Sequence, residues 1–440
     1  MRNYSILMFL IGLGAMTKIV IVGSVAISEI FILSLAPILF VKNYKSLRHD
    51  GFLPVLLLLV LTMCGCAIAT IVNGSPMFRS IKVLAQYYSI FSVIVFFHGP
   101  LSKDPKSLKW FLLGAFISGL ITIFAFNASL KVSATGNLDV QEATVEGVLS
   151  GAMFWMFQLQ NALNAFVGGF YTEMPYLFSV MAPVVAVVII GLTGISGRAL
   201  SLCLLGGWLL IVYCGKNTKR MRSVSRHFIS FIIVGILAII LFKTTYSHLA
   251  RSGILGEEAM VKYYNQTKTG DSILRLLMRG RVEFFIGLRA AIDKPFVGYG
   301  IYPLDTKGYI QEYILKYGDE QDLRLYVHSL IHSGVYMEHL IPTHSYLVGS
   351  WVFCGIFGLL LWLYVLYLCF MYFKRWIAAI PQWFGYFSLG IPILVWDIFF
   401  SPITNRIMPA VMIAAILLAK AVYEGRMNNY YEIGTDNARR

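Results

Sequence analysis

The sequence predicts an all-α polytopic membrane protein with about twelve transmembrane helices and one large, partly helical extracytoplasmic loop. Of its 440 residues, 58% are hydrophobic and only 13% are charged, whereas a soluble globular chain carries about 25% charged residues. Runs of roughly 20 apolar residues, long enough to cross a bilayer as helices, recur along the chain. Because these runs are continuously apolar and do not alternate, a closed β-barrel is excluded.

Twelve apolar runs define the predicted spans. They are residues 4–22, 24–41, 52–73, 80–98, 110–128, 148–170, 174–193, 199–214, 228–243, 345–373, 383–400 and 406–423. Lysine and arginine gather in the short loops between them, as at Lys42, Lys45 and Arg48, and the positive-inside rule places such loops in the cytoplasm. The net charge of +14 is therefore interpreted as a topology signal, with no nucleic-acid partner. Both termini, including the tail at residues 424–440, are expected in the cytoplasm.

The span at residues 148–170 depends on a parity argument. It is polar for a span, with Gln158, Gln160, Asn161 and Asn164, and such amides are costly in lipid unless they face the bundle or a wet cavity. The strongest basic cluster, at residues 216–226, is expected in the cytoplasm, so an odd number of spans must lie between residues 130 and 215. The runs at 148–170, 174–193 and 199–214 give an odd number of spans only if 148–170 is counted as one of them.

The ninth and tenth spans are separated by residues 245–343, which we predict to be one large extracytoplasmic loop within a single membrane domain of residues 1–440. The loop holds eleven Lys/Arg and eleven Asp/Glu, and a long neutral loop is translocated whatever its charge. Residues Arg281 to Ile292 have the spacing of an amphipathic helix. Pro295 ends this helix, and Gly298-Tyr299-Gly300 predicts a turn after it.

Three charged features are predicted on the same outer face: Arg198 in a tight turn, Arg279 and Arg281 in the loop, and His344 at the start of the tenth span. Arginine grips phosphate with two hydrogen bonds, and histidine exchanges a proton near neutral pH. Together these residues predict a diphosphate clamp. The alternatives are an anchoring role for Arg198 at a helix end, solvated loop charges, and an interfacial histidine without a catalytic role.

Other polar groups have weaker patterns. His328 and His332 stand at metal-binding spacing, but the glutamate of a zinc hydrolase is missing between them, so surface packing is the preferred interpretation and no metal is predicted. Glu29 and Asp397 lie within predicted spans, where carboxylates are functional candidates by default; each alternatively lies near a span end or pairs with a neighbour such as Arg406. Glu173 falls in a turn that we place inside; the alternative, if the parity argument is wrong, is an outward-facing Glu173 that could act as a general base.

His344-Ser345, nine residues, and then Gly355-Ile356-Phe357-Gly358 resembles a motif of the bacterial O-antigen ligase/O-antigen polymerase superfamily. That motif is a His followed by Asn, Ser or Gln, nine residues and Gly-x-x-Gly, just after a large periplasmic loop. Ser196-Gly197-Arg198 is similar to the family's Ser-Arg pair, although Gly197 interrupts it. The family's loop arginine, which begins an amphipathic helix ending in Pro-x-x-Gly-x-Gly, corresponds to Arg281 through Gly300, with Arg279 competing for the role.

The resemblance, which covers roughly residues 148–400, implies a metal-independent, inverting glycosyltransferase of the membrane GT-C type in the bacterial inner membrane. Its donor is expected to be a glycan on undecaprenyl diphosphate, and no cofactor is expected. His344, Arg281 and Arg198 are the implied catalytic residues, with His344 serving the acceptor hydroxyl. Arg279, Arg289 and Ser345 are predicted to contact substrate.

Three functions are compatible with these features. The first is a ligase that transfers O-antigen from its lipid carrier to lipid A-core or a similar acceptor. The second is a polymerase that joins repeat units on the same carrier, for which the acceptor is another glycan. The third is a lipid or glycan transporter, which predicts internal repeats and broken helices with charges at the midplane; the sequence has no evident repeat, and its best polar groups are predicted at the outer face.

Overall fold

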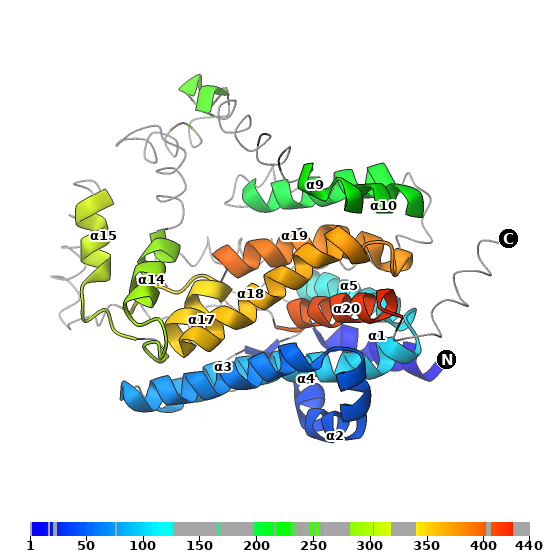
Figure 1. The fold of residues 1–440 in the computed structure, drawn as a ribbon, viewed down its shortest axis with the longest axis horizontal. Helices are drawn as coiled ribbons and strands as arrows, with labels where there is room; N and C mark the ends of the chain where they lie inside the picture. The colour runs from blue at the N-terminus through cyan, green and yellow to red at the C-terminus, as the bar shows by residue number, and fades with distance from the viewer. Residues whose placement is uncertain are drawn as a thin grey trace.

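A computed structural model describes most of the amino-terminal and carboxy-terminal parts of the chain and pieces of its middle. The described residues are 2–15, 18–20, 24–74, 77–125, 198–214, 217–230, 247–249, 251–254, 282–301, 303–317, 340–401 and 406–425, with a few isolated positions between them. Within these ranges the protein is mostly helical (Figure 1). The sequence prediction of a helical membrane protein is confirmed at this level.

The described helices are α1 (Arg2–Ala15), α2 (Ile27–His49), α3 (Leu53–Val72), α4 (Met77–Lys103), α5 (Ser107–Ala125), α9 (Arg198–Cys214), α10 (Thr218–Arg226), α14 (Val282–Asp293), α15 (Tyr309–Tyr317), α17 (Tyr346–Cys354), α18 (Ile356–Met371), α19 (Phe384–Phe400) and α20 (Ile407–Tyr423). Five stretches among them are long and apolar enough to cross a membrane: Ile27–His49, Leu53–Val72, Ser80–Lys103, Ile356–Trp376 and Pro381–Phe400. The segments Tyr4–Ala15, Ser107–Ile121 and Ile407–Tyr423 are shorter apolar helices.

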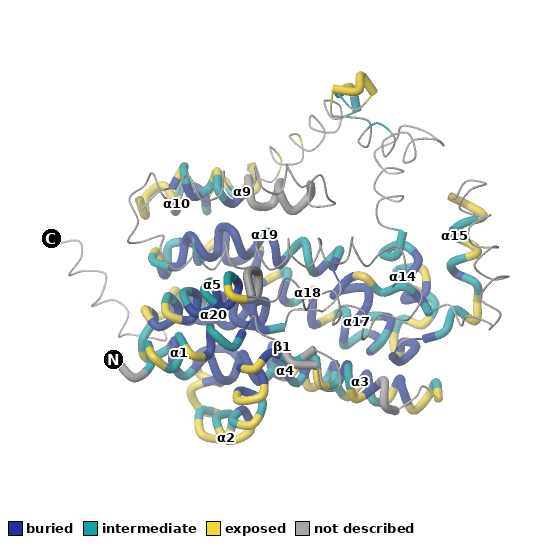
Figure 2. Tube along the Cα trace, turned by 180° about the vertical axis from the view of Figure 1, so that it is seen from behind, coloured by how far each residue is buried: buried dark blue, intermediate teal, exposed yellow. Residues whose placement is uncertain are grey.

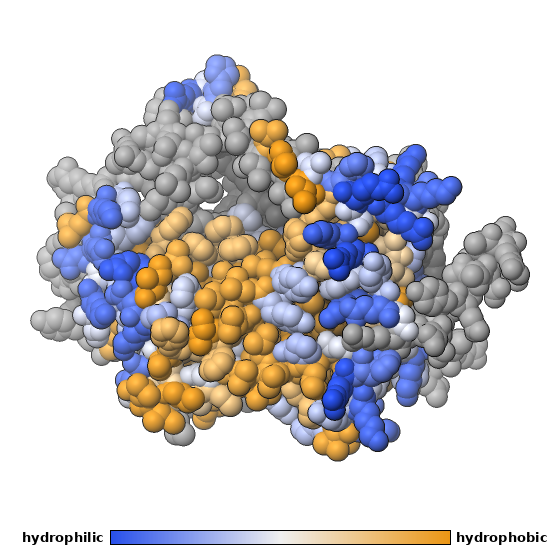
Figure 3. Space-filling model, viewed as in Figure 1, coloured by the Kyte–Doolittle hydropathy of each residue, from blue (hydrophilic) through white to orange (hydrophobic). Residues whose placement is uncertain are grey.

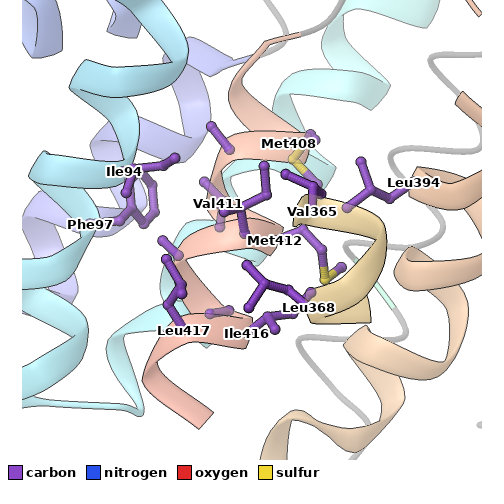
Figure 4. Packing of buried hydrophobic residues seen from close by; sticks show 14 of the residues in the cluster. Ile94, Phe97, Val365, Leu368, Leu394, Met408, Val411, Met412, Ile416 and Leu417 are labelled. Carbon is purple, nitrogen blue, oxygen red and sulfur yellow. The ribbon is translucent and has the colours of Figure 1, made fainter. Parts of the chain in front are cut away.

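Helix α20 forms the centre of the bundle. Nearly all of its residues are buried (Figure 2), because α4, α18 and α19 surround it. Met408, Val411, Met412, Ile416 and Leu417 of α20 pack among residues of these neighbours, including Ile94 and Phe97 of α4, Val365 and Leu368 of α18 and Leu394 of α19 (Figure 4). A helix that is hydrophobic on all sides is typical of such a buried position or of a membrane span.

On the face of the molecule seen in Figure 3, the described residues have the distribution of polarity that a bilayer favours. Figure 3 shows an apolar band between two hydrophilic ends. One end carries the basic helix α10, and the other end carries α14 and α15 (Figure 1). At the basic end, α2 and α4 are joined by a hydrogen bond of 2.7 Å between His98 Nε2 and Asp50 Oδ2. Burial by itself raises the pKa of Asp50, but hydrogen bonds with His98 and His49 outweigh it and leave that pKa below its ordinary value.

The connection between the first two helices differs from the prediction. The sequence predicts spans at 4–22 and 24–41, but α1 ends at Ala15 and α2 begins at Ile27. Between them strand β1 (Lys18–Val20) pairs antiparallel with strand β2 (Ser24–Ala26), so the described chain is not entirely α-helical. The physical reason is composition, because this apolar stretch is rich in Val and Ile, whose branched side chains favour strands.

Candidate functional site

The predicted tenth span, residues 345–373, is not one helix. It is broken at Gly355 into α17 and α18, and α17 folds back along α18. The Trp362 Nε1–H donates to Ser350 Oγ at 2.7 Å, and the rings of Tyr346 and Trp362 lie 4.9 Å apart. Residues twelve positions apart in a continuous helix are separated by about 18 Å, so these contacts require a helical hairpin. Residues 346–354 therefore form a short helix that folds back on α18, which we call the re-entrant helix, and only α18 continues along the bundle.

Gly355 and Gly358 make the hairpin possible. Gly355 has φ +64°, a left-handed conformation that glycine adopts at no steric cost. A Cβ on Gly358 would stand 2.1 Å from the Ser350 carbonyl oxygen, so only glycine allows the two helices to approach so closely. Both glycines therefore admit a neighbouring backbone at the break.

The motif Pro295–Gly300 lies against this break; we call residues Pro295–Tyr299 the strap. The Ile356 N–H donates to the Phe296 carbonyl at 3.1 Å, and the Tyr299 N–H donates to the Val352 carbonyl at 2.7 Å. The Trp351 Nε1–H donates to the Pro295 carbonyl at 2.9 Å. The strap therefore supplies partners for backbone groups that the interrupted helix leaves free.

Helix α14 connects the strap to the amino end of α17. Its residues Ile286, Ala290 and Ala291 are buried together with Val348 and Val352 of α17. The predicted amphipathic helix at Arg281–Ile292 is thus confirmed for Val282–Asp293, and its apolar face packs on the re-entrant helix. Because α14 and α17 share this core, the start of α14 lies beside the start of α17.

His344 stands at that junction, immediately before α17. Its side chain is 58% exposed, and its Nδ1 lies 4.0 Å from Oε1 of Glu283 in the first turn of α14. Ser345 is the N-cap of α17: its Oγ accepts the Val348 N–H at 3.0 Å and donates to the Ile398 carbonyl of α19 at 2.9 Å. The site thus has an accessible histidine beside a carboxylate, on a helix amino end that is fixed to α19.

Glu283 is the member of this site that the sequence interpretation missed. Its only signal was its position in the first turn of the predicted amphipathic helix, two residues after Arg281. Nothing in the sequence indicates that it faces His344, because that contact joins residues 61 positions apart through the packing of α14 on α17.

Arg289 lies further along α14 and takes part in a local network. Its Nη1 is 2.5 Å from Asp293 Oδ1, and its Nε is 3.7 Å from Glu312 Oε2 of α15. The Tyr309 hydroxyl also donates to Asp293, at 2.8 Å. The bond from Tyr309 lowers the pKa of Asp293 the most, and the bond from Arg289 lowers it further. The charge of Arg289 is therefore already offset by neighbouring carboxylates.

The remaining predicted site residues are not placed as side chains. Arg198 is the first residue of α9, and only its backbone position is described. Arg279 and Arg281, which precede α14 in the sequence, lie outside the described residues. Glu173, His328 and His332 also lie outside them. Among the residues that the structure describes, no group of three or more His, Cys, Asp or Glu side chains is arranged to hold a metal ion.

The two predicted intramembrane carboxylates each lie within one turn of a helix end. Glu29 forms a two-point ion pair with Arg406, with Nε–Oε1 at 2.8 Å and Nη2–Oε2 at 3.0 Å. The proposed alternative, that Glu29 pairs with Arg406, is confirmed. Asp397, one turn before the end of α19, bonds to Ser401 through its side chain. Both carboxylates are therefore held by partners close to helix ends.

Comparisons of this chain with protein-family models, with curated proteins and with solved structures find no match.

Proposed function

We propose that this chain is a glycosyltransferase of the O-antigen ligase type, which transfers a glycan from undecaprenyl diphosphate to lipid A-core or a similar acceptor. One observation carries the proposal: the separate elements of the motif form one unit around His344. The His–Gly spacing is the length of a re-entrant helix, and the Pro-x-x-Gly-x-Gly element lies against its break. A chance match of two short motifs gives no reason for them to contact each other.

The proposed reaction is an inverting transfer at His344. The acceptor hydroxyl oxygen forms a bond to the anomeric carbon of the donor sugar, while the bond from that carbon to the diphosphate oxygen breaks. His344 takes the hydroxyl proton, and the carboxylate of Glu283, 4.0 Å from Nδ1, stabilises the imidazolium that forms. Undecaprenyl diphosphate leaves with its negative charge.

The leaving diphosphate needs positive groups around it. In this proposal Arg198 and Arg281, or Arg279 in place of Arg281, neutralise the charge as it develops. The amino end of α17 adds the positive end of a helix dipole. Ser345 orients that helix end through its bond to Ile398, and Arg289 contributes only if it exchanges Asp293 for phosphate.

The proposed setting is the bacterial inner membrane, with about twelve spans, both termini in the cytoplasm and residues 245–343 in the periplasm. The basic end of the bundle, with α10, then faces the cytoplasm according to the positive-inside rule. His344 and α14 face the periplasm, where the glycan and its carrier are presented. Membrane lipids, the carrier-linked glycan and the acceptor are the expected partners, and no cofactor takes part.

The test is to delete the gene and to separate the surface glycan on a gel. Loss of all O-chains with polymer left on the carrier supports the ligase. Core that bears a single repeat unit instead indicates the polymerase, which uses the same donor and the same His344 chemistry with a glycan acceptor. Unchanged surface glycan would exclude both functions.

Point variants then test the site in the deletion strain. We expect His344→Ala to give the deletion pattern at normal protein level, because a general base contributes about 10²- to 10⁴-fold. Glu283→Gln should lower transfer by less, because Glu283 acts only through His344. His227→Ala is the matched control, because His227 is also exposed but follows the basic helix α10 at the opposite end. A His344→Ala protein that restores the wild-type pattern would remove His344 from the mechanism.

A further inference from the structure

The strap carries an apolar surface that the site does not use. The side chain of Phe296 is 74% exposed, and those of Val297 and Ile292 are also exposed. These residues belong to the segment 245–343, which composition predicts to be a polar, water-facing loop. Leaving such apolar surface in water costs about 25 cal/mol per Å², so an apolar partner for these residues would stabilise the protein.

The strap is joined directly to the lipid-facing end of a spanning helix. Asn73, which follows the last residue of α3, donates from Nδ2 to the Gly298 carbonyl at 3.3 Å. Its Oδ1 accepts a bond of 2.8 Å from Lys294 Nζ. The residues just before Asn73 are Ile71, 79% exposed, and Val72. Exposed apolar residues therefore lie at the end of α3 and in the strap, on either side of the bonds made by Asn73.

Five backbone groups of the strap have hydrogen-bond partners within the protein. Irregular backbone at membrane depth is tolerated only where its polar groups find protein partners. The carbonyls of Pro295, Phe296 and Gly298 accept bonds from Trp351, Ile356 and Asn73, respectively. The N–H groups of Gly298 and Tyr299 donate to Lys294 and Val352.

A cation marks the boundary of this surface. Lys294 lies directly before the strap, bonds to Asn73, and places its ammonium 4.6 Å from the centre of the Tyr299 ring. Lysine at the edge of an apolar surface is typical of the membrane interface, where its ammonium reaches the lipid headgroups; the ring of Tyr299 beneath it is buried. Helix α15, which follows in sequence, is polar by comparison, with Gln311, Glu312 and Lys316.

From these contacts we infer that the strap is a membrane-inserted segment, with Phe296 and Val297 among the acyl chains of the outer leaflet and Lys294 at the headgroups. The partner is the bilayer itself. The strap thereby anchors the end of α14 and the α17–α18 break at a fixed depth in the membrane. The inference does not depend on glycosyl transfer, and it holds or fails whatever reaction the chain catalyses.

The test measures the depth of a nitroxide label in the full-length protein in phosphatidylcholine–phosphatidylglycerol vesicles. Phe296→Cys is labelled in a background with Cys64 and Cys203 replaced by alanine, because Cys64 is exposed whereas Cys66, Cys214, Cys354 and Cys369 are buried. Two matched controls carry the label at other exposed apolar positions. Val72→Cys, at the end of α3, reports lipid, and Leu315→Cys, on α15 with a side chain 65% exposed, reports water.

The measured quantities are the rates at which the label collides with oxygen, which is concentrated in lipid, and with a water-soluble nickel chelate, which is excluded from lipid. We expect the label at 296 to resemble that at 72, with high oxygen collision and at least threefold lower nickel collision than at 315. A label at 296 that collides with nickel as often as the one at 315 would place the strap in water and overturn the inference. Low collision with both reagents would mean that protein covers the strap, and would also overturn it.

Discussion

Replacing Arg406 with methionine should destabilise the protein more than any exposed substitution, because it leaves Glu29 charged and buried. Glu29 is 3% exposed and Arg406 is 12% exposed. The change removes two charge-assisted hydrogen bonds, of 2.8 and 3.0 Å, while Ser89 Oγ and the Ala26 N–H remain bonded to the carboxylate. Breaking a buried pair by removing one partner costs about 3–5 kcal/mol, and we expect a value in that range.

The assay is reversible unfolding in mixed dodecyl maltoside–SDS micelles, followed by circular dichroism. Glu29→Gln and the double variant complete a mutant cycle, in which the double variant should cost at least about 2 kcal/mol less than the sum of the single variants. Arg222→Met is the control, since Arg222 is exposed on α10 and should stay within about 0.5 kcal/mol of the wild type. Additive costs, or an Arg406→Met cost equal to that of the control, would refute a coupled buried pair.

Three further predictions use the same unfolding assay or hydrogen exchange. Gly355→Ala should cost more than about 3 kcal/mol, because a Cβ there meets the strap at 2.0 Å; Gly253→Ala, also at positive φ but in open space, should cost only about 1–2 kcal/mol, and equal costs would contradict the packing argument. Trp362→Phe should cost about 1 kcal/mol through its lost bond to Ser350, whereas no change would mean that the bond does not hold the hairpin. Because the pKa of Asp293 is lowered in the folded protein, its stabilising effect is complete above its ordinary value of 3.8 and disappears as pH falls through the lower folded value. The protection of the α15 amides against exchange, relative to their intrinsic rates, should therefore decrease as the pH falls below 3.8, and Asp293→Asn should abolish this pH dependence.

Hydropathy and charge predict the class of fold because each signal depends only on residues that are adjacent in the sequence. Apolar runs such as Leu53–Val72 form helices in any bilayer, and the basic cluster at α10 lies at one end of the bundle as the positive-inside rule requires. The same local signal misplaces the first two helices. Residues 16–26 are as apolar as a span, but their β-branched side chains allow a short strand pair instead.

The site is predictable only in part, since its decisive contacts join distant segments. The pairing of Glu29 with Arg406 was accessible from the sequence, because an intramembrane carboxylate needs a partner and few cations are available near a span end. The contact between His344 and Glu283 was not, because it depends on how α14 packs on α17. Hydropathy also hides the break at Gly355, since α17 and α18 are equally apolar and their junction contains no charge.

The break also gives a physical meaning to the spacing of the His–Gly motif. The nine residues of α17 span about 13 Å along a helix axis, which sets how far His344 is held from Gly355. Since each residue also turns a helix by about 100°, a different spacing would rotate His344 away from Glu283 even if the hairpin still formed. The strap and Gly358 fix the carboxy-terminal end of α17, and the bond from Ser345 to Ile398 fixes its amino-terminal end. The nine-residue interval is therefore a positioning device for the histidine, and the glycines contribute to the site by defining where α17 ends.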